Sequence, residues 1–154
     1  EEERRGRKLA NPGRDQGNLG IDSNVLVAYL VPEHPDHERT RALARESHAV
    51  NPTVIHETYH ACVFKLRRSP ADTVKALLDY MDLATCLPIG PAIVERGLKL
   101  ALRHSLGGRD ALVLASYLSS DGVKGFVTMD KSLLSLKEVR FGKRALKISP
   151  LPAY

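Results

Sequence analysis

The chain has 154 residues, 43% of them hydrophobic and only 5% aromatic, and it contains no Trp. This length suits one domain with a mainly aliphatic core, and no apolar run approaches the roughly 18 residues that a membrane-spanning helix needs. Lys and Arg outnumber Asp and Glu by 23 to 18, which is compatible with a polyanionic partner without requiring one.

The charged start of the chain, residues 1–18, is expected to be a flexible tail before a single domain over residues 19–154. This start lacks the apolar stretch of a secretory signal. The two cysteines, Cys62 and Cys86, lie among apolar residues and form no Cys-x-x-Cys pair. We therefore expect two buried thiols in a reducing, cytoplasmic protein that does not associate with membranes.

The first half of this domain predicts short strands that alternate with helices. In chain order we expect a strand ending at residues 20–22, an apolar helix over 24–31, a charged helix over 32–47, a buried strand in 48–52, a helix from 53 and another from 70. Asn51 and Pro52 suit the start of the helix from 53. The apolar stripe of that helix is Ile55, Tyr59, Cys62, Val63 and Leu66, and the apolar face of the next helix is Val74, Leu77, Leu78 and Met81.

The second half continues the alternation. We expect a strand in residues 85–90, an amphipathic helix over 91–105 that ends at Gly107 and Gly108, a buried helix from 110, a strand over 125–130, a helical turn over 131–136 and a last strand over 145–150. The alternation predicts an α/β fold with a central parallel sheet flanked by helices. Ligands of such sheets bind at the carboxyl ends of the strands.

Four acidic residues lie at the boundaries of these elements. Asp22 follows the first strand, Glu57 lies in the second turn of the helix from 53, Asp110 opens the buried helix and Asp130 closes the strand over 125–130. Each alone could be a helix cap or a surface residue. In a parallel sheet, three of them converge near its carboxyl edge, and carboxylates held close together favour protonation unless a cation neutralises them. Oxygen ligands favour Mg²⁺ or Mn²⁺, ions that promote phosphodiester hydrolysis.

The stretches that carry these acids resemble a known family. "GIDSNVLVAYL", "NPTVIHETYH", "GGRDALVLASYL" and "FVTMDKSL" follow one another in the order and spacing of a PIN domain, most like the VapC-type toxin ribonucleases. The resemblance covers about residues 19–150. It implies a PIN-like fold and a Mg²⁺- or Mn²⁺-dependent endoribonuclease, the toxin of a type II toxin–antitoxin pair. It also implies a homodimer that a small antitoxin protein inhibits.

The resemblance also implies roles for individual residues. The catalytic and cation-binding set is Asp22, Glu57, Asp110 and Asp130, in which Glu57 completes the acidic cluster and helps to position the attacking water. Ser23 and Thr128 would orient the carboxylates through their hydroxyl groups. Asn24 would do the same or contact the substrate.

Basic residues near these motifs are candidates for binding RNA phosphates. Lys65, Arg67 and Arg68 form one cluster, and Arg109 stands next to Asp110. Arg109 could equally form an ion pair with a neighbouring acid.

The pattern His56-Glu57-x-x-His60 is that of zinc metalloproteases. The extended form of the pattern fails, because Val63 and Leu66 stand where it requires Gly and a third His. We therefore prefer the nuclease. The alternatives are a PIN-like RNA-binding or assembly module without catalysis and a zinc hydrolase. Divalent-metal dependence of RNA cleavage discriminates among them.

Overall fold

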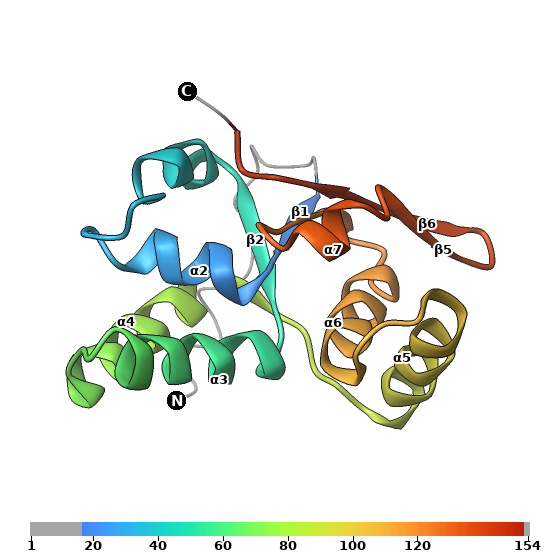
Figure 1. The fold of residues 1–154 in the computed structure, drawn as a ribbon, viewed down its shortest axis with the longest axis horizontal. Helices are drawn as coiled ribbons and strands as arrows, with labels where there is room; N and C mark the ends of the chain where they lie inside the picture. Colours follow the sequence, from blue (N-terminus) through green and yellow to red (C-terminus); the bar gives the residue numbers. More distant parts are fainter. Residues whose placement is uncertain (1–16, 153–154) are drawn as a thin grey trace.

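The computed structural model describes residues 17–152, which form a sheet flanked by helices (Figure 1). With the labels of Figure 1, the strands are β1 (Asn18–Ile21), β2 (Ser47–Val50), β3 (Thr85–Cys86), β4 (Val123–Val127), β5 (Glu138–Phe141) and β6 (Arg144–Ser149). The helices are α2 (Ser23–Leu30), the 3₁₀-helix η1 (Glu38–Arg45), α3 (Pro52–His60), its π-helical continuation η2 (Ala61–Lys65), α4 (Pro70–Leu83), α5 (Pro91–His104), α6 (Gly108–Leu118) and α7 (Lys131–Leu134).

The sheet has six strands in the order β3-β2-β1-β4-β6-β5. All neighbouring strands are parallel except β5, which runs antiparallel to β6. The predicted α/β fold with a central, mainly parallel sheet is confirmed. Because β1 and β4 are parallel neighbours, their carboxyl ends lie at the same edge of the sheet.

The end of β1 is held by close packing against α6. The phenol of Tyr117 donates a 2.6 Å hydrogen bond to the carbonyl oxygen of Ile21. A Cβ atom at Gly20 would come within 2.7 Å of the Tyr117 ring, so only glycine lets the strand lie this close to the helix. Tyr117 and Ile21 are both buried. This contact fixes the backbone immediately before Asp22.

The local sequence explains where two of the helices begin. The side chain of Asn51 accepts a 3.0 Å hydrogen bond from the backbone N–H of Val54, and Pro52 occupies the first helical position of α3. Ser69 caps α4 in the same way through the backbone N–H of Asp72. Both starts were predicted, and both are confirmed.

Several predicted boundaries were wrong. The charged helix over 32–47 is only the short 3₁₀-helix η1, preceded by turns. Helix α5 ends at His104 and is followed by Ser105, which has φ 54°, and Gly107 instead precedes the first residue of α6. Asp110 is therefore inside the first turn of α6 and does not open the helix. The strand expected over 125–130 is β4, which ends at Val127, so Asp130 lies beyond it at the start of α7.

The buried face of α3 is also shifted from the predicted stripe. Val54, Thr58 and Cys62 are buried, whereas Ile55 and Tyr59 are only partly buried. On α4, Val74 and Leu78 are 43% and 51% exposed. Val74 and Leu78 help to line an apolar groove of about 810 Å³ between α3 and α4, which we call the α3–α4 groove. Its lining residues include Ile55, Tyr59, Val74, Leu77, Leu78 and Met81.

The described residues begin at residue 17, inside the predicted tail, and end at residue 152. Residues 1–16, most of the predicted tail, lie outside the described residues, as do residues 153–154. Asn18, which was assigned to the tail, already belongs to β1. Within the described part of the chain, no helix has the length and apolar character needed to cross a bilayer.

Candidate active site

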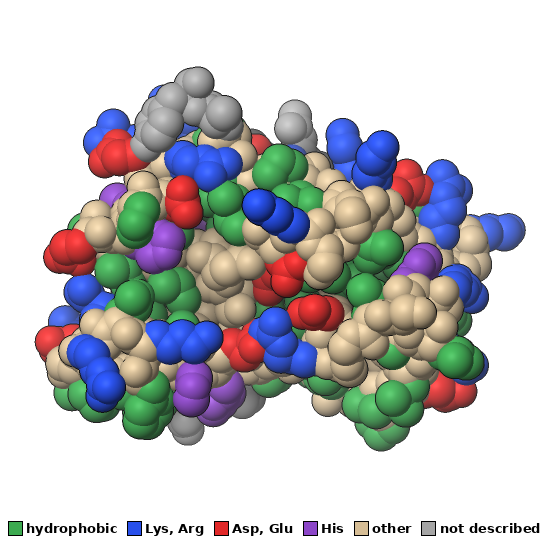
Figure 2. All heavy atoms as spheres, viewed as in Figure 1, with side chains coloured by type: hydrophobic (Ala, Val, Ile, Leu, Met, Phe, Trp, Pro, Cys, Tyr) green, Lys and Arg blue, Asp and Glu red, His purple; other side chains and the backbone are tan. Residues whose placement is uncertain are grey.

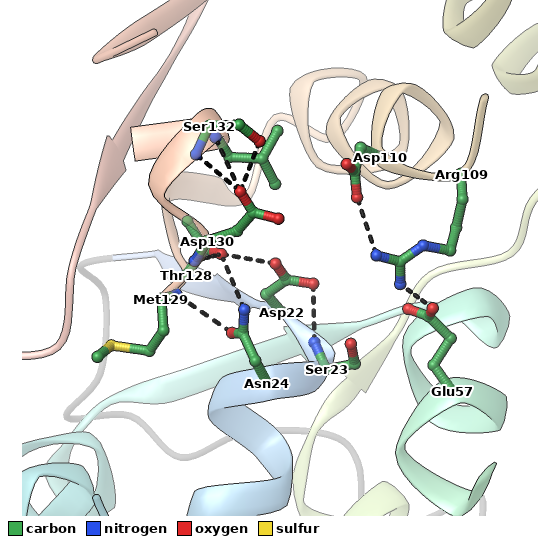
Figure 3. Close-up of polar contacts among 11 residues, drawn as sticks. Asp22, Ser23, Asn24, Glu57, Arg109, Asp110, Thr128, Met129, Asp130 and Ser132 are labelled. Carbon is green, nitrogen blue, oxygen red and sulfur yellow. Dashed lines mark hydrogen bonds and ion pairs between the residues drawn. The ribbon is translucent and has the colours of Figure 1, made fainter. Parts of the chain in front are cut away.

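The four predicted acids lie around one space at the carboxyl edge of the sheet (Figure 3). Asp22 follows β1, Asp130 lies at the start of α7 beyond β4, Asp110 is in the first turn of α6, and Glu57 is on α3. We call these four residues the acidic cluster. In the space-filling view of the same face, acidic side chains gather near its middle with a basic side chain among them (Figure 2).

Asp22 is the most buried member of the acidic cluster, with 4% of its surface exposed. Its Oδ1 atom accepts a 2.8 Å hydrogen bond from the backbone N–H of Ser23, and its Oδ2 atom accepts a 2.6 Å bond from the Thr128 hydroxyl. Burial raises the pKa of Asp22, and these two hydrogen bonds oppose the rise. A carboxylate held in this way gains from a nearby cation.

Thr128 and Asn24 connect Asp22 to the backbone around Asp130. The Thr128 hydroxyl oxygen also accepts hydrogen bonds from the backbone N–H of Asp130 at 3.1 Å and from the Asn24 amide at 3.4 Å. The Asn24 side-chain oxygen accepts a 3.2 Å bond from the backbone N–H of Met129. Both residues therefore lie where they can orient carboxylates. Ser23 differs from its prediction, because its backbone N–H and not its hydroxyl bonds to Asp22.

Asp130 caps α7 with one carboxylate oxygen. Its Oδ1 atom accepts hydrogen bonds from the Ser132 backbone N–H at 2.8 Å, the Ser132 hydroxyl at 2.6 Å and the Leu133 N–H at 3.2 Å. The Ser132 hydroxyl bond is the main cause that lowers the pKa of Asp130. Ser132 was not among the predicted site residues, although a hydroxyl residue two positions after Asp is a common local capping partner.

Glu57 and Asp110 are joined by Arg109. The Arg109 guanidinium forms an ion pair with the Glu57 carboxylate and a second one, at 3.0 Å, with Asp110 Oδ1. Two roles were predicted for Arg109, binding of an RNA phosphate and an ion pair with a neighbouring acid. The structure shows the ion pair. The other oxygen of Glu57, Oε2, is buried and has no hydrogen-bond partner within the described residues. A buried acceptor of this kind calls for a water or a ligand group.

The basic cluster of Lys65, Arg67 and Arg68 lies away from these acids. Lys65 is eight residues after Glu57, which corresponds to about 12 Å along the helix. Arg68 forms a 3.0 Å ion pair with Glu33. The structure therefore does not bring these three residues into the acidic cluster, and phosphate binding by them stays a prediction.

The zinc-protease pattern is not assembled into a zinc site. His56 and His60 are both exposed, and the Glu57 between them pairs with Arg109. His60 instead lies with its ring centroid 5.1 Å from that of the exposed Phe64. In residues 17–152, no three His, Cys, Asp or Glu side chains are drawn together tightly enough to hold a metal ion as they stand. Within the acidic cluster, the guanidinium of Arg109 lies between two of the acids (Figure 3).

The donor atoms of the acidic cluster nevertheless match the chemistry of a hard divalent cation. All of them are carboxylate oxygens, the ligands that Mg²⁺ and Mn²⁺ prefer. In the described residues, Asp130 and Asp110 each keep one carboxylate oxygen without a hydrogen bond or ion pair. Side-chain rotation could turn these oxygens towards the desolvated Asp22. The residues present therefore fit an oxygen-liganded ion better than zinc.

Comparisons with known proteins agree with this geometry. The family model described as "PIN domain" matches residues 20–140 of the chain. This span includes the whole acidic cluster. No curated protein sequence matches the chain significantly.

Solved structures with the same fold include one described as a toxin and one described as a toxin–antitoxin complex. One is VapC20 of Mycobacterium tuberculosis, described as a toxin that cleaves the sarcin–ricin loop, with a TM-score of 0.65 at 14% identity over 77% of this chain and 95% of that one. A second is DNA-bound VapBC of Salmonella typhimurium, with a TM-score of 0.63 at 13% identity over 88% and 98% of the two chains. A third is VapBC2 of Rickettsia felis on a promoter DNA fragment, with a TM-score of 0.61 at 11% identity over 86% and 97%. At these identities the likeness establishes a shared fold.

Proposed function

The chain belongs to the PIN domain family, and on this premise we propose that it is a Mg²⁺- or Mn²⁺-dependent endoribonuclease, the toxin of a type II toxin–antitoxin pair. The observation that carries the proposal is the convergence of Asp22, Glu57, Asp110 and Asp130 around one space at the carboxyl edge of the sheet (Figure 3). A structural role for these acids would not require four of them, from four separate elements, in one place.

Different residues of the acidic cluster would have different roles in hydrolysis. A bound Mg²⁺ or Mn²⁺ would lower the pKa of water and stabilise the charge that develops on the phosphate. Asp22, Asp110 and Asp130 would hold the ion. Thr128 keeps the carboxylate of Asp22 in one orientation through its 2.6 Å hydrogen bond.

Glu57 is suited to orient or deprotonate the attacking water. Its buried Oε2 atom has no hydrogen-bond partner in the described residues, so it can accept a proton or a hydrogen bond from a water that approaches the phosphate. Arg109 holds the other side of the same carboxylate. General-base assistance of this kind typically contributes about 100- to 10,000-fold to a rate. We expect no covalent enzyme intermediate.

RNA as the substrate is supported by the family resemblance and by VapC20, a relative in fold that is described as cleaving the sarcin–ricin loop. The net charge of +5 favours approach to a polyanion. We propose that phosphates of the RNA lie across the acidic cluster with basic side chains on either side of it. Lys65, Arg67 and Arg68 are candidates on the α3 side.

An antitoxin and a second copy of the chain are the proposed protein partners. Several of the solved structures of this fold are complexes of VapB with VapC or are described as toxin–antitoxin complexes. The α3–α4 groove and the exposed Val94, Leu98 and Leu102 of α5 provide apolar surface that such partners would cover. Light scattering of the purified protein, alone and with the co-expressed antitoxin, tests both partners.

The direct test is cleavage of labelled RNA by the purified chain in EDTA, Mg²⁺, Mn²⁺ and Zn²⁺, beside the Asp22→Asn variant. We expect cleavage in Mg²⁺ or Mn²⁺, none in EDTA and none by the variant. The RNA set should include total RNA and ribosomal RNA fragments, so that a narrow sequence preference does not hide activity.

Three other results would count against the proposal. Cleavage that survives Asp22→Asn would come from a contaminating nuclease. RNA binding without cleavage in any cation would favour a PIN-like RNA-binding or assembly module. Zn²⁺-specific peptide hydrolysis that depends on His56 and His60 would favour the zinc hydrolase.

A further inference from the structure

Arg109 is a basic residue beside two members of the acidic cluster. It lies in the first turn of α6 and bridges two acids from different elements, Glu57 of α3 and Asp110 of α6 (Figure 3). Its side chain is 47% exposed, while those of Glu57 and Asp110 are 26% and 23% exposed. The guanidinium therefore lies at the mouth of the site and reaches inward to both acids.

The positive charge of Arg109 also acts on the remaining two acids. At Asp22, burial raises the pKa and the charge of Arg109 opposes that rise. At Asp130, the Ser132 hydroxyl bond is the main cause of the lowered pKa, and the charge of Arg109 adds to it. Arg109 forms no ion pair with either acid in the described residues, so it acts on them at a distance, whereas it contacts Glu57 and Asp110 directly.

Two groups of oxygens in the acidic cluster determine where a divalent cation can bind. Glu57 Oε1 and Asp110 Oδ1 are occupied by Arg109. Asp130 Oδ2 and the second oxygen of Asp110 make no hydrogen bond or ion pair within residues 17–152, and Asp130 Oδ2 points into the space beside Asp22 (Figure 3). The guanidinium opposes cation binding at the oxygens of the first group, because like charges repel at that distance.

We propose that Arg109 acts as a fixed positive charge in this site. Its ion pair with Glu57 keeps the divalent ion away from Glu57 and confines the ion to a single position bounded by Asp22, Asp110 and Asp130. This inference rests on the proposed function, because it presupposes that a divalent ion binds at the acidic cluster. Arg109 is then a positioning residue: it sets how many ions bind and keeps Glu57 free of them, so that the Oε2 atom of Glu57 stays available to water.

The test is the number and affinity of Mn²⁺ ions bound by the full chain, measured by calorimetry and by the electron paramagnetic resonance signal of free Mn²⁺. Wild type is expected to bind one Mn²⁺. Arg109→Gln is expected to bind two, the first at least fivefold more tightly, and Arg109→Lys, which keeps the charge, is expected to bind one. Adding Glu57→Gln to Arg109→Gln should remove the second ion.

Two further variants control for charge and for folding. Arg41→Gln removes one positive charge from an exposed ion pair with Glu38, outside the acidic cluster, and should bind Mn²⁺ as wild type does. Glu57→Gln alone removes a negative charge beside the site and leaves Arg109 paired with Asp110 alone, so this variant should bind one Mn²⁺ with a lower affinity than wild type. Melting temperatures in EDTA identify any variant that fails to fold.

The outcomes separate this inference from the function on which it rests. One Mn²⁺ in both wild type and folded Arg109→Gln, with equal affinities, would overturn the role of Arg109 and leave the nuclease proposal intact. No Mn²⁺ bound by either wild type or folded Arg109→Gln would overturn the proposed function, and this inference with it.

Discussion

The Thr128 hydroxyl donates a 2.6 Å hydrogen bond to Asp22 Oδ2 and accepts one from the backbone N–H of Asp130 at 3.1 Å. Thr128 is fully buried, so water cannot replace these bonds. In Thr128→Val, which keeps the shape of the side chain, both bonds are lost. We expect the free energy of unfolding, measured with urea, to fall by about 2–3 kcal/mol.

The same substitution should weaken Mn²⁺ binding and RNA cleavage, because Asp22 is no longer held in one orientation. Thr128→Ser keeps the hydroxyl and is the matched control, with cleavage expected to stay close to wild type. If Thr128→Val and Thr128→Ser lose cleavage to the same extent, the methyl packing of Thr128 matters and its hydrogen bonds do not.

The pKa of Asp22 predicts an unusual dependence of stability on pH. Burial raises this pKa above its ordinary value of 3.8, so the folded chain binds this proton more tightly than the unfolded chain does. The resulting stabilisation is fully present below pH 3.8 and is lost as the pH rises through the raised pKa. In EDTA, the melting temperature of wild type minus that of Asp22→Asn should therefore fall as the pH rises from about 3.5 to 7.

Asp130 should behave in the opposite way and serves as the internal control. Its pKa is lowered, chiefly by the Ser132 hydroxyl, so its stabilisation is present above the ordinary pKa and is lost as the pH falls through the lowered one. The melting temperature of wild type minus that of Asp130→Asn should rise with pH. Slopes of the same sign for Asp22→Asn and Asp130→Asn would contradict the opposite environments assigned to these carboxyls.

Gly20 should tolerate no side chain. A Cβ atom there would lie 2.7 Å from two ring atoms of Tyr117, a buried residue whose phenol is bonded to the Ile21 carbonyl. Gly20→Ala is expected to lower the free energy of unfolding by about 1–3 kcal/mol and to displace Asp22. Gly125→Ala is the comparison in the neighbouring strand, where the nearest atoms are 3.6 Å away, and it should have little effect in the same urea titration.

The two histidines of the zinc-protease pattern should be dispensable. Both are exposed, and within the described residues neither belongs to a set of three metal-binding side chains. The double variant His56→Ala/His60→Ala should cleave RNA in Mg²⁺ or Mn²⁺ within about twofold of wild type. Glu57→Gln, in the same helix, should lose at least about 100-fold. A large loss in the histidine variant would place these side chains in the substrate path.

Much of the fold was predictable because short-range signals determine it. The Asn51-Pro52 start of α3 and the polar residue after β1 lie directly beside the apolar runs that they bound. Strand β5 was missed because it is short and its apolar residues alternate with charged ones. Its Val139 and Phe141 alternate with charged residues before Gly142, which has φ 60°, and this is the pattern of a hairpin strand.

The site was predictable in its members but not in its contacts. Asp22, Asp110 and Asp130 could be selected because each borders an apolar segment, and Glu57 because the family resemblance implies it. The bridge from Arg109 to Glu57 joins residues that are distant in the sequence, and no local pattern indicates it. The use of the Ser23 backbone in place of its hydroxyl likewise depends on the exact backbone direction after β1.

The most direct test of the central claim is the position of Mn²⁺ in crystals of the protein, located by anomalous X-ray scattering. We predict a peak bounded by Asp22, Asp110 and Asp130, and its loss in Asp22→Asn crystals. A peak against His56 and His60, or an empty acidic cluster at saturating Mn²⁺, would contradict a nuclease that works through a cation held by these carboxylates.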